Sequence, residues 1–106
     1  MITCYIKEKS WIARIAAKKL KATAVAIVIG NTIHLHNASR EAFLKNERWV
    51  RHELKHVRQF REHGFVRFLF LYVLESIRHG YKQNKYEVEA RAAESDDSIS
   101  RGIVIA

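Results

Sequence analysis

The sequence has no proline, only four glycines and a single cysteine among its 106 residues. With no second cysteine to pair with, Cys4 excludes an intramolecular disulfide and a metal site built from cysteines, and we expect it to be a small buried residue. No low-complexity stretch marks a linker, and the length suits one modest hydrophobic core. We therefore expect one domain over residues 1–106.

Long apolar runs are also missing. The longest extends from Phe65 to Ile77, is interrupted by Arg67 and Glu75, and falls short of the roughly 20 residues that span a bilayer. Charged residues also interrupt every apolar stretch near the N-terminus, so we expect neither a signal sequence nor a transmembrane segment, and a cytoplasmic location. We interpret the aromatic-rich run as a helix in the core, with a lipid- or partner-binding surface as the alternative.

The chain is nevertheless rich in positive charge, with 19 Lys and Arg against 11 Asp and Glu and a formal net charge of +8. Such a surface favours anionic partners, including nucleic acid, acidic lipid and acidic polypeptide. Arg48, Arg51, Lys55 and Arg58 recur at helical spacing. This basic stripe predicts a solvated helix face or a surface for an acidic partner; nucleic acid is the weakest candidate because no nucleic-acid motif is present.

Strand-like and helical patterns follow one another along the chain and predict the α+β class, with a small β-hairpin or sheet and several packed helices. Alternation in Thr32–His36 places Ile33 and Leu35 on one face of a strand and His34 and His36 on the other. The predicted elements are a helix over 10–21, a hairpin of 23–29 with 32–36 around Gly30-Asn31, one or two helices over 41–63, and helices over 65–79 and 84–94. The β-prone segment 102–106 either pairs with the hairpin edge or forms a loose tail.

One short motif carries chemistry: His52-Glu53-Leu54-Lys55-His56. Histidines four residues apart lie on the same face of a helix and can share a metal ion, and zinc accepts this arrangement. Glu53 follows the first histidine directly, where its carboxylate can act as a general base toward a water molecule. The motif thus predicts two zinc ligands and a base.

A third ligand has to come from elsewhere in the chain. The extended H-E-x-x-H-x-x-G-x-x-H pattern fails because Gln59 and Glu62 occupy its glycine and histidine positions, and His63 is one residue out of register. A glutamate from a second helix is the other established solution, and Glu87 and Glu89 both qualify.

The segment from His52 to Gln59, the aromatic-rich helix after it, and Asn84 to Ala90 together resemble the minimal gluzincin-like zinc metallopeptidase domains, many of them bacterial. The resemblance covers roughly Asn31 to Glu94. It implies a zincin-like fold in which His52, His56 and Glu87 hold Zn²⁺ and Glu53 is the catalytic base. Ala90 matches the small residue of the family pattern, and Glu89 is the alternative ligand.

The chain also departs from that family. Arg91 stands where the family commonly has an aspartate four residues after the ligand, so the carboxylate that orients a ligand histidine is missing from its usual place. Losing such a partner typically weakens metal binding or activity about 10- to 100-fold. The family also lays its substrate along the outer strand of a small sheet. Residues 32–37 resemble that strand, which would bring His34 and His36 to the cleft.

These patterns together predict a zinc-dependent metallopeptidase that acts on a peptide or protein. An oxyanion-stabilising donor is also needed, and Tyr81, Tyr86 and His79 are all candidates. The alternative is a proteolytically inactive zinc-binding module whose basic face meets an acidic partner or nucleic acid. Arg91 favours that alternative.

Overall fold

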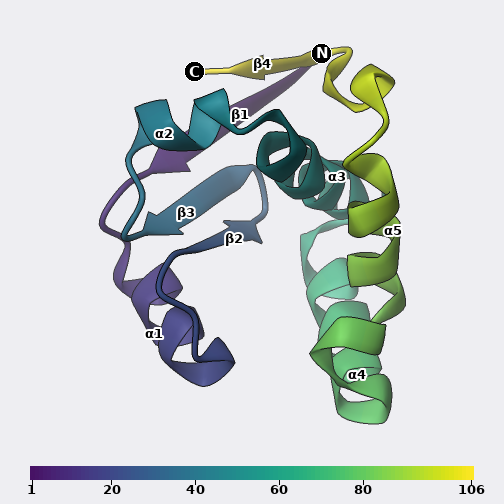
Figure 1. The fold of residues 1–106 in the computed structure, drawn as a ribbon. Coiled ribbons are helices and arrows are strands. Elements are labelled where there is room, and N and C mark those ends of the chain that lie inside the picture. The colour runs from purple at the N-terminus through teal and green to yellow at the C-terminus, as the bar shows by residue number, and fades with distance from the viewer.

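The computed structural model describes residues 1–106 and has the α+β architecture that the sequence predicts (Figure 1). A four-stranded sheet packs against a group of helices. In chain order the elements are β1 (Ile2–Lys7), α1 (Trp11–Leu20), β2 (Val25–Ile29), β3 (Thr32–His36), α2 (Arg40–Lys45), α3 (Glu47–His63), α4 (Phe65–Gln83), α5 (Lys85–Ala93), a short 3-10 turn η1 (Asp97–Ser100) and β4 (Ile103–Ile105).

The sheet has the strand order β2-β3-β1-β4. The predicted hairpin is confirmed: β2 and β3 pair antiparallel around Gly30, whose φ of 66° suits the first central position of the tight turn. β3 also pairs in parallel with β1, so it is an interior strand. The expectation that residues 32–37 form the outer strand is therefore wrong. β2 occupies the sheet edge instead.

The two faces of β3 have different surroundings. Ile33 and Leu35 are fully buried, as the alternation predicts. His34 points to the opposite face, where its Nδ1 lies 2.9 Å from Oγ of Ser10, the N-cap residue of α1. Since residues two apart share a face, His36 lies on that side as well, beside Glu8 and Trp11. Both histidines are therefore turned away from the helices that follow, which corrects their predicted place at the cleft.

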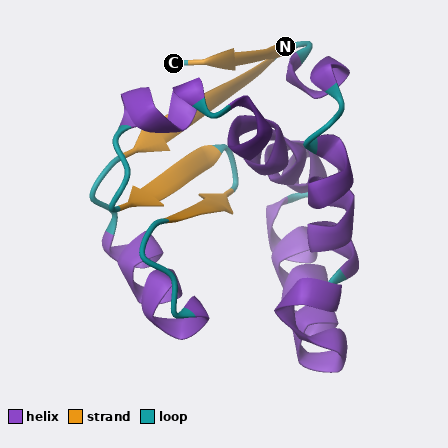
Figure 2. Ribbon diagram, in the orientation of Figure 1, coloured by secondary structure: helices purple, strands orange, loops and turns teal.

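The main core lies between the sheet and α3. Its largest fully buried side chains include Ile33 and Leu35 from the sheet, Leu54 from α3 and Phe43 from α2, and Cys4 is buried with them as expected. Figure 2 shows the strands gathered on one side of the molecule and α3, α4 and α5 on the other. Because α3 is covered on both flanks, Glu53, His56 and Gln59 become buried polar residues.

The interpretation of α4 as a core helix is wrong for most of its length. Only Phe68 is fully buried. Leu71 and Tyr72 are partly buried against the core, and most of the other large apolar residues of the run are exposed. The exposed ones are Phe65, Val66, Leu69, Phe70, Val73 and Ile77. α4 packs mainly on α3 and α5. None of the helices has the length and apolar character needed to span a membrane.

The C-terminal segment returns across α3 to the sheet. β4 pairs in parallel with β1, a strand that the sequence patterns did not reveal, and not with the hairpin edge. Part of the basic stripe holds this segment. Arg51 donates to the backbone carbonyl of Glu94 at 3.0 Å, and Arg58 donates to those of Ile99, at 2.8 Å, and Arg101. These arginines serve the fold, and the stripe is not simply a solvated face.

Candidate metal centre

The helix α3 presents both histidines of the motif to one place. Asn46 caps its first turn, with the side-chain oxygen accepting from the backbone N–H of Trp49 at 3.1 Å. No helix breaker follows until Gly64, so the four-residue spacing translates into adjacent positions on one face. The rings of His52 and His56 lie 5.2 Å apart between centroids, and both side chains are largely buried.

Glu87 reaches the histidines from α5, and a buried asparagine places it there. Asn84 is fully buried and caps α5, accepting from the backbone N–H of Tyr86 at 2.9 Å. Its amide group donates to the carbonyl of Tyr72 and to Oγ of Ser76, both on α4. Asn84 therefore fixes the start of α5 relative to α4, and Glu87 follows within the first turn.

The three predicted ligand residues converge. Nε2 of His52 lies 3.0 Å and Nε2 of His56 lies 3.2 Å from the same oxygen, Oε1 of Glu87. One ligand atom from each residue lies within 4.8 Å of the others, which is close enough to bind a metal ion. Glu89, the alternative ligand, points elsewhere: its carboxylate accepts from the amide of Gln59 at 3.0 Å.

Zinc chemistry fits this donor set. Two nitrogens and a carboxylate oxygen are typical protein ligands of catalytic zinc, which keeps a fourth position open. Two atoms that each lie 2.0 to 2.1 Å from zinc at the tetrahedral angle are about 3.3 Å apart. The separations of 3.0 and 3.2 Å between the histidine nitrogens and Glu87 are close to that value.

The other ring nitrogens have partners of their own. Nδ1 of His52 lies 2.9 Å from Oε2 of Glu94, and the second carboxylate oxygen of Glu94 pairs with Arg48 at 3.3 Å. The orienting carboxylate is thus present after all, three residues beyond Arg91 along the chain. Arg91 instead donates to the carbonyl of Lys82 and joins the ends of α4 and α5.

Sequence reasoning missed the partner of the second histidine. Nδ1 of His56 lies 2.8 Å from Oε1 of Gln59, which is 1% exposed. The Gln59 amide nitrogen donates to the carbonyl of Tyr86 and to Glu89, so its oxygen has to face the imidazole. A glutamine three residues after His56 on a helix is a detectable signal, because side chains at this spacing are neighbours.

Burial and charge perturb the titrating groups of the centre. Burial raises the pKa of Glu53 to about 7, although the neighbouring histidines lower it. For His52, burial lowers the pKa, but the hydrogen bond to Glu87 and the charge of Glu53 outweigh the effect of burial and raise the pKa to about 9. Burial works to raise the pKa of Glu87, yet its hydrogen bonds with His52 and His56 hold it well below the usual range.

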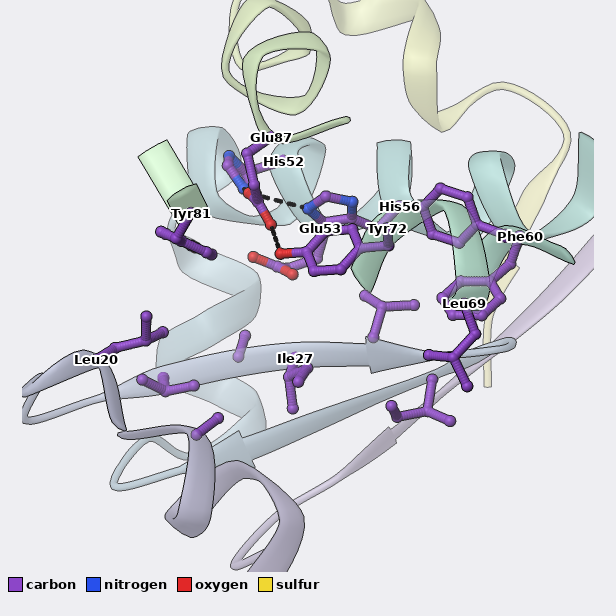
Figure 3. Close-up of a pocket in the computed structure, with 16 residues that line it drawn as sticks. Leu20, Ile27, His52, Glu53, His56, Phe60, Leu69, Tyr72, Tyr81 and Glu87 are labelled. Carbon is purple, nitrogen blue, oxygen red and sulfur yellow. Dashed lines mark hydrogen bonds and ion pairs between the residues drawn. The ribbon is translucent and has the colours of Figure 1, made fainter. Parts of the chain in front are cut away.

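A cleft opens beside the centre, between α4 and the edge strand β2. Figure 3 shows Glu53 and the hydroxyl of Tyr72 facing this space, with Ile27 of β2 opposite them and Tyr81 at one side. Tyr72 donates to Oε2 of Glu87. Gly80, with φ 78° and ψ 168°, kinks α4 just before Tyr81.

Of the predicted oxyanion donors, Tyr81 and His79 line the cleft. Tyr86 does not, because its ring is buried against Phe68, 5.0 Å away between centroids. Tyr72 was not among the predicted donors, although its place on the aromatic-rich helix brings it to the centre.

A family model described as the eCIS core domain matches residues 11–64, just over half of the chain. The chain belongs to the eCIS core domain family. The match spans α1 to the end of α3 and includes His52, Glu53 and His56, whereas Glu87 lies beyond it. No curated protein and no solved structure shows a significant match to this eCIS core domain.

Proposed function

We propose that this eCIS core domain is a zinc-dependent metallopeptidase of the gluzincin type, with His52, His56 and Glu87 as zinc ligands. The observation that carries the proposal is the convergence of both Nε2 atoms on one oxygen of Glu87, at 3.0 and 3.2 Å. Glu53 lines the same cleft. Zinc bound there would polarise a carbonyl group and lower the pKa of a water molecule to about 7.

Glu53 is the general base in this mechanism. It is buried beside His52 and His56 and lines the cleft, so its carboxylate lies close enough to accept a proton from a water molecule bound at the metal. Its carboxylate takes the proton of the attacking water and then passes it to the amine that leaves. The hydrolysis therefore needs no further acid from the chain.

Tyr81 is the donor best placed to stabilise the oxyanion. It lines the cleft beside Glu53, whereas the hydroxyl of Tyr72 donates to Oε2 of Glu87. Burial, with the charges of Glu87 and Glu53 beside it, raises the pKa of Tyr81 above its usual range, so the hydroxyl stays protonated. A lost donor of this kind costs about 2.7 to 4 kcal/mol of transition-state stabilisation.

The test measures metal and hydrolysis separately. We expect the purified protein to contain stoichiometric zinc and to cleave an unfolded protein such as casein. Glu53→Gln should keep the zinc and lose at least about 100-fold in kcat, a typical contribution of a general base. His56→Ala should lose the zinc as well. His36→Ala, on the opposite face of the sheet, is the control and should change neither.

Two results would overturn the proposal in different ways. If the purified protein contains no zinc, and His56→Ala has the same metal content as the wild type, the proposed metal centre is overturned. Stoichiometric zinc, with hydrolysis equal in the wild type and in Glu53→Gln, would leave a metal-binding module that is not a peptidase.

A further inference from the structure

The cleft at the metal centre has two halves of different character. One half is a cavity of about 100 Å³, and twelve of its sixteen lining residues are hydrophobic. The other is an open hollow of about 980 Å³ in which only seven of sixteen are hydrophobic. His52 and Glu53 line both halves. The metal centre therefore lies at their junction.

Apolar side chains from both sides enclose the smaller half. Ile27 comes from the edge strand β2, and Leu69 and Phe60 lie across from it (Figure 3). Val28 and Phe68 also line this half. The cavity is somewhat smaller than one of roughly 150 Å³ that accepts a benzene ring. It therefore has room for no more than one apolar side chain, which loses its contact with water on entry.

Basic side chains surround the larger half. Lys19 comes from the end of α1, Arg48 from the start of α3 and Lys82 from the end of α4, so three separate elements bring cations to one rim. Neither lysine takes part in any of the ion pairs in the structure.

No free acidic group balances these cations inside the hollow. Of its two acidic residues, Glu53 is only 5% exposed, and Glu94 is already paired with His52 and Arg48. Exposed cations that have no partner attract anionic groups, and a concave surface concentrates their field.

We propose that the cleft selects extended peptides with acidic side chains on one side of the scissile bond and a large apolar side chain on the other. This inference rests on the proposed peptidase activity. The bond lies at the metal centre, where the two halves meet. The acidic side chains lie beside Lys19 and Lys82, and the apolar one enters the cavity beneath Leu69. β2 lines both halves along a free edge, which suits an extended backbone.

Binding is tested apart from hydrolysis in the zinc-loaded Glu53→Gln protein. The probes are short fluorescein-labelled peptides with three glutamates beside Ala-Leu-Phe-Ala, in both sequence orders, and the same peptides with glutamine in place of glutamate. Fluorescence anisotropy should show about fivefold tighter binding of one acidic peptide than of its glutamine counterpart at low salt. The difference should shrink as salt is raised, because exposed charges are screened.

Charge reversal identifies the residues responsible. In Lys19→Glu/Lys82→Glu the preference for the acidic peptide should disappear, with the affinity for the glutamine peptide nearly unchanged. The control Lys7→Glu/Arg14→Glu lowers the net charge equally but alters residues outside the cleft, and should keep the preference. Arg48 is left intact because its pairing with Glu94 supports His52. Replacing Leu and Phe by Ala in the peptide should weaken binding to every variant.

Equal binding of acidic and glutamine peptides, or a preference that survives in Lys19→Glu/Lys82→Glu, would overturn the proposed selectivity. So would a control variant that loses the preference as fully as the cleft variant, since net charge alone would then explain it. If selectivity fails in one of these ways but the wild type still hydrolyses casein, only the selectivity proposal is overturned and the peptidase proposal stands. If the protein binds the acidic peptide selectively but the wild type hydrolyses nothing, the peptidase proposal is overturned and the selectivity stands.

Discussion

The two histidines of the candidate metal centre have different supporting neighbours. His52 has a carboxylate, Glu94, at Nδ1, whereas His56 has the neutral amide oxygen of Gln59. An acceptor at Nδ1 holds the proton there and leaves Nε2 free to bind a metal ion. Glu94 is the C-cap residue of α5 and its side chain is only partly buried, while Gln59 is fully buried and fixed by Tyr86 and Glu89. The second contact is therefore the more rigid.

Replacing Gln59 by leucine should weaken zinc binding about 10- to 100-fold, because Nδ1 of His56 loses the acceptor that orients the ring. The carbonyl of Tyr86 also loses a donor, so we expect unfolding to become easier by about 1 to 3 kcal/mol. Competition with a chelator, at a temperature where the variant is fully folded, separates the two effects. Gln83→Leu, an exposed position on α4, is the control. Unchanged zinc affinity in Gln59→Leu would contradict the positioning role.

The kink in α4 depends on Gly80. Its φ of 78° and ψ of 168° lie in a region that essentially only glycine occupies. An added Cβ would meet no atom within 4 Å, so the cost of Gly80→Ala is conformational and not steric. We expect a loss of about 1 to 3 kcal/mol in urea unfolding and a reduced kcat from the displacement of Tyr81. The neighbouring exposed substitution Arg78→Ala should leave stability nearly unchanged, and equal stabilities of the two variants would argue against strain at Gly80.

Local patterns predicted the elements that depend on local signals. Ser10 and Ser39 cap α1 and α2, Gly30 turns the hairpin, and Gly64 ends α3, and each is visible in the sequence. The proximity of His52 and His56 was also predictable, since helix spacing places them on one face. Choosing Glu87 over Glu89 needed the family resemblance, because on a helix two residues so close in sequence cannot be ranked by spacing alone.

What local patterns could not reveal depends on contacts distant in sequence. β1 carries no distinctive alternation, and its pairing with β3 and β4 joins segments far apart in the chain. The exposed apolar side of α4 looks like a core helix in sequence, because periodicity records the side-chain types and not whether another element covers them. Glu94 and Lys82 likewise gain their roles only when α4 and α5 pack beside α3.

The sheet and the helical group are joined by the C-terminal segment as well as by the core. Arg58 on α3 donates to the carbonyls of Ile99 and Arg101, and β4 then pairs with β1. Arg58→Ala should therefore release residues 97–106, seen as faster amide hydrogen exchange in β4 and η1, at a cost of about 1 to 3 kcal/mol. Arg61→Ala, an exposed residue on the same helix, should not do so. Exchange in β4 that is equally slow in both variants would show that pairing with β1 alone holds the segment.

Zinc should also change how the stability of the protein depends on pH, because the metal competes with protons for the histidines. Without metal, the hydrogen bonds to Glu87 raise the pKa of His52 to about 9 and raise that of His56 as well. A raised histidine pKa contributes stability that is complete below the unfolded value of about 6.5 and is lost as the pH rises through the folded value. Zinc binds the neutral imidazoles, so its affinity rises over the same interval.

The melting temperature of chelator-treated protein should therefore decrease as the pH rises from about 6.5 to 9. Over the same interval, the rise in melting temperature that a fixed excess of free zinc produces should become larger. Circular dichroism melts at several pH values, with zinc and with chelator, measure both trends. In His56→Ala the zinc-induced increase should be small at every pH. A zinc-induced increase that stays constant or shrinks from pH 6.5 to 9 in the wild type would mean that the metal does not displace protons from His52 and His56, and would place its binding site elsewhere.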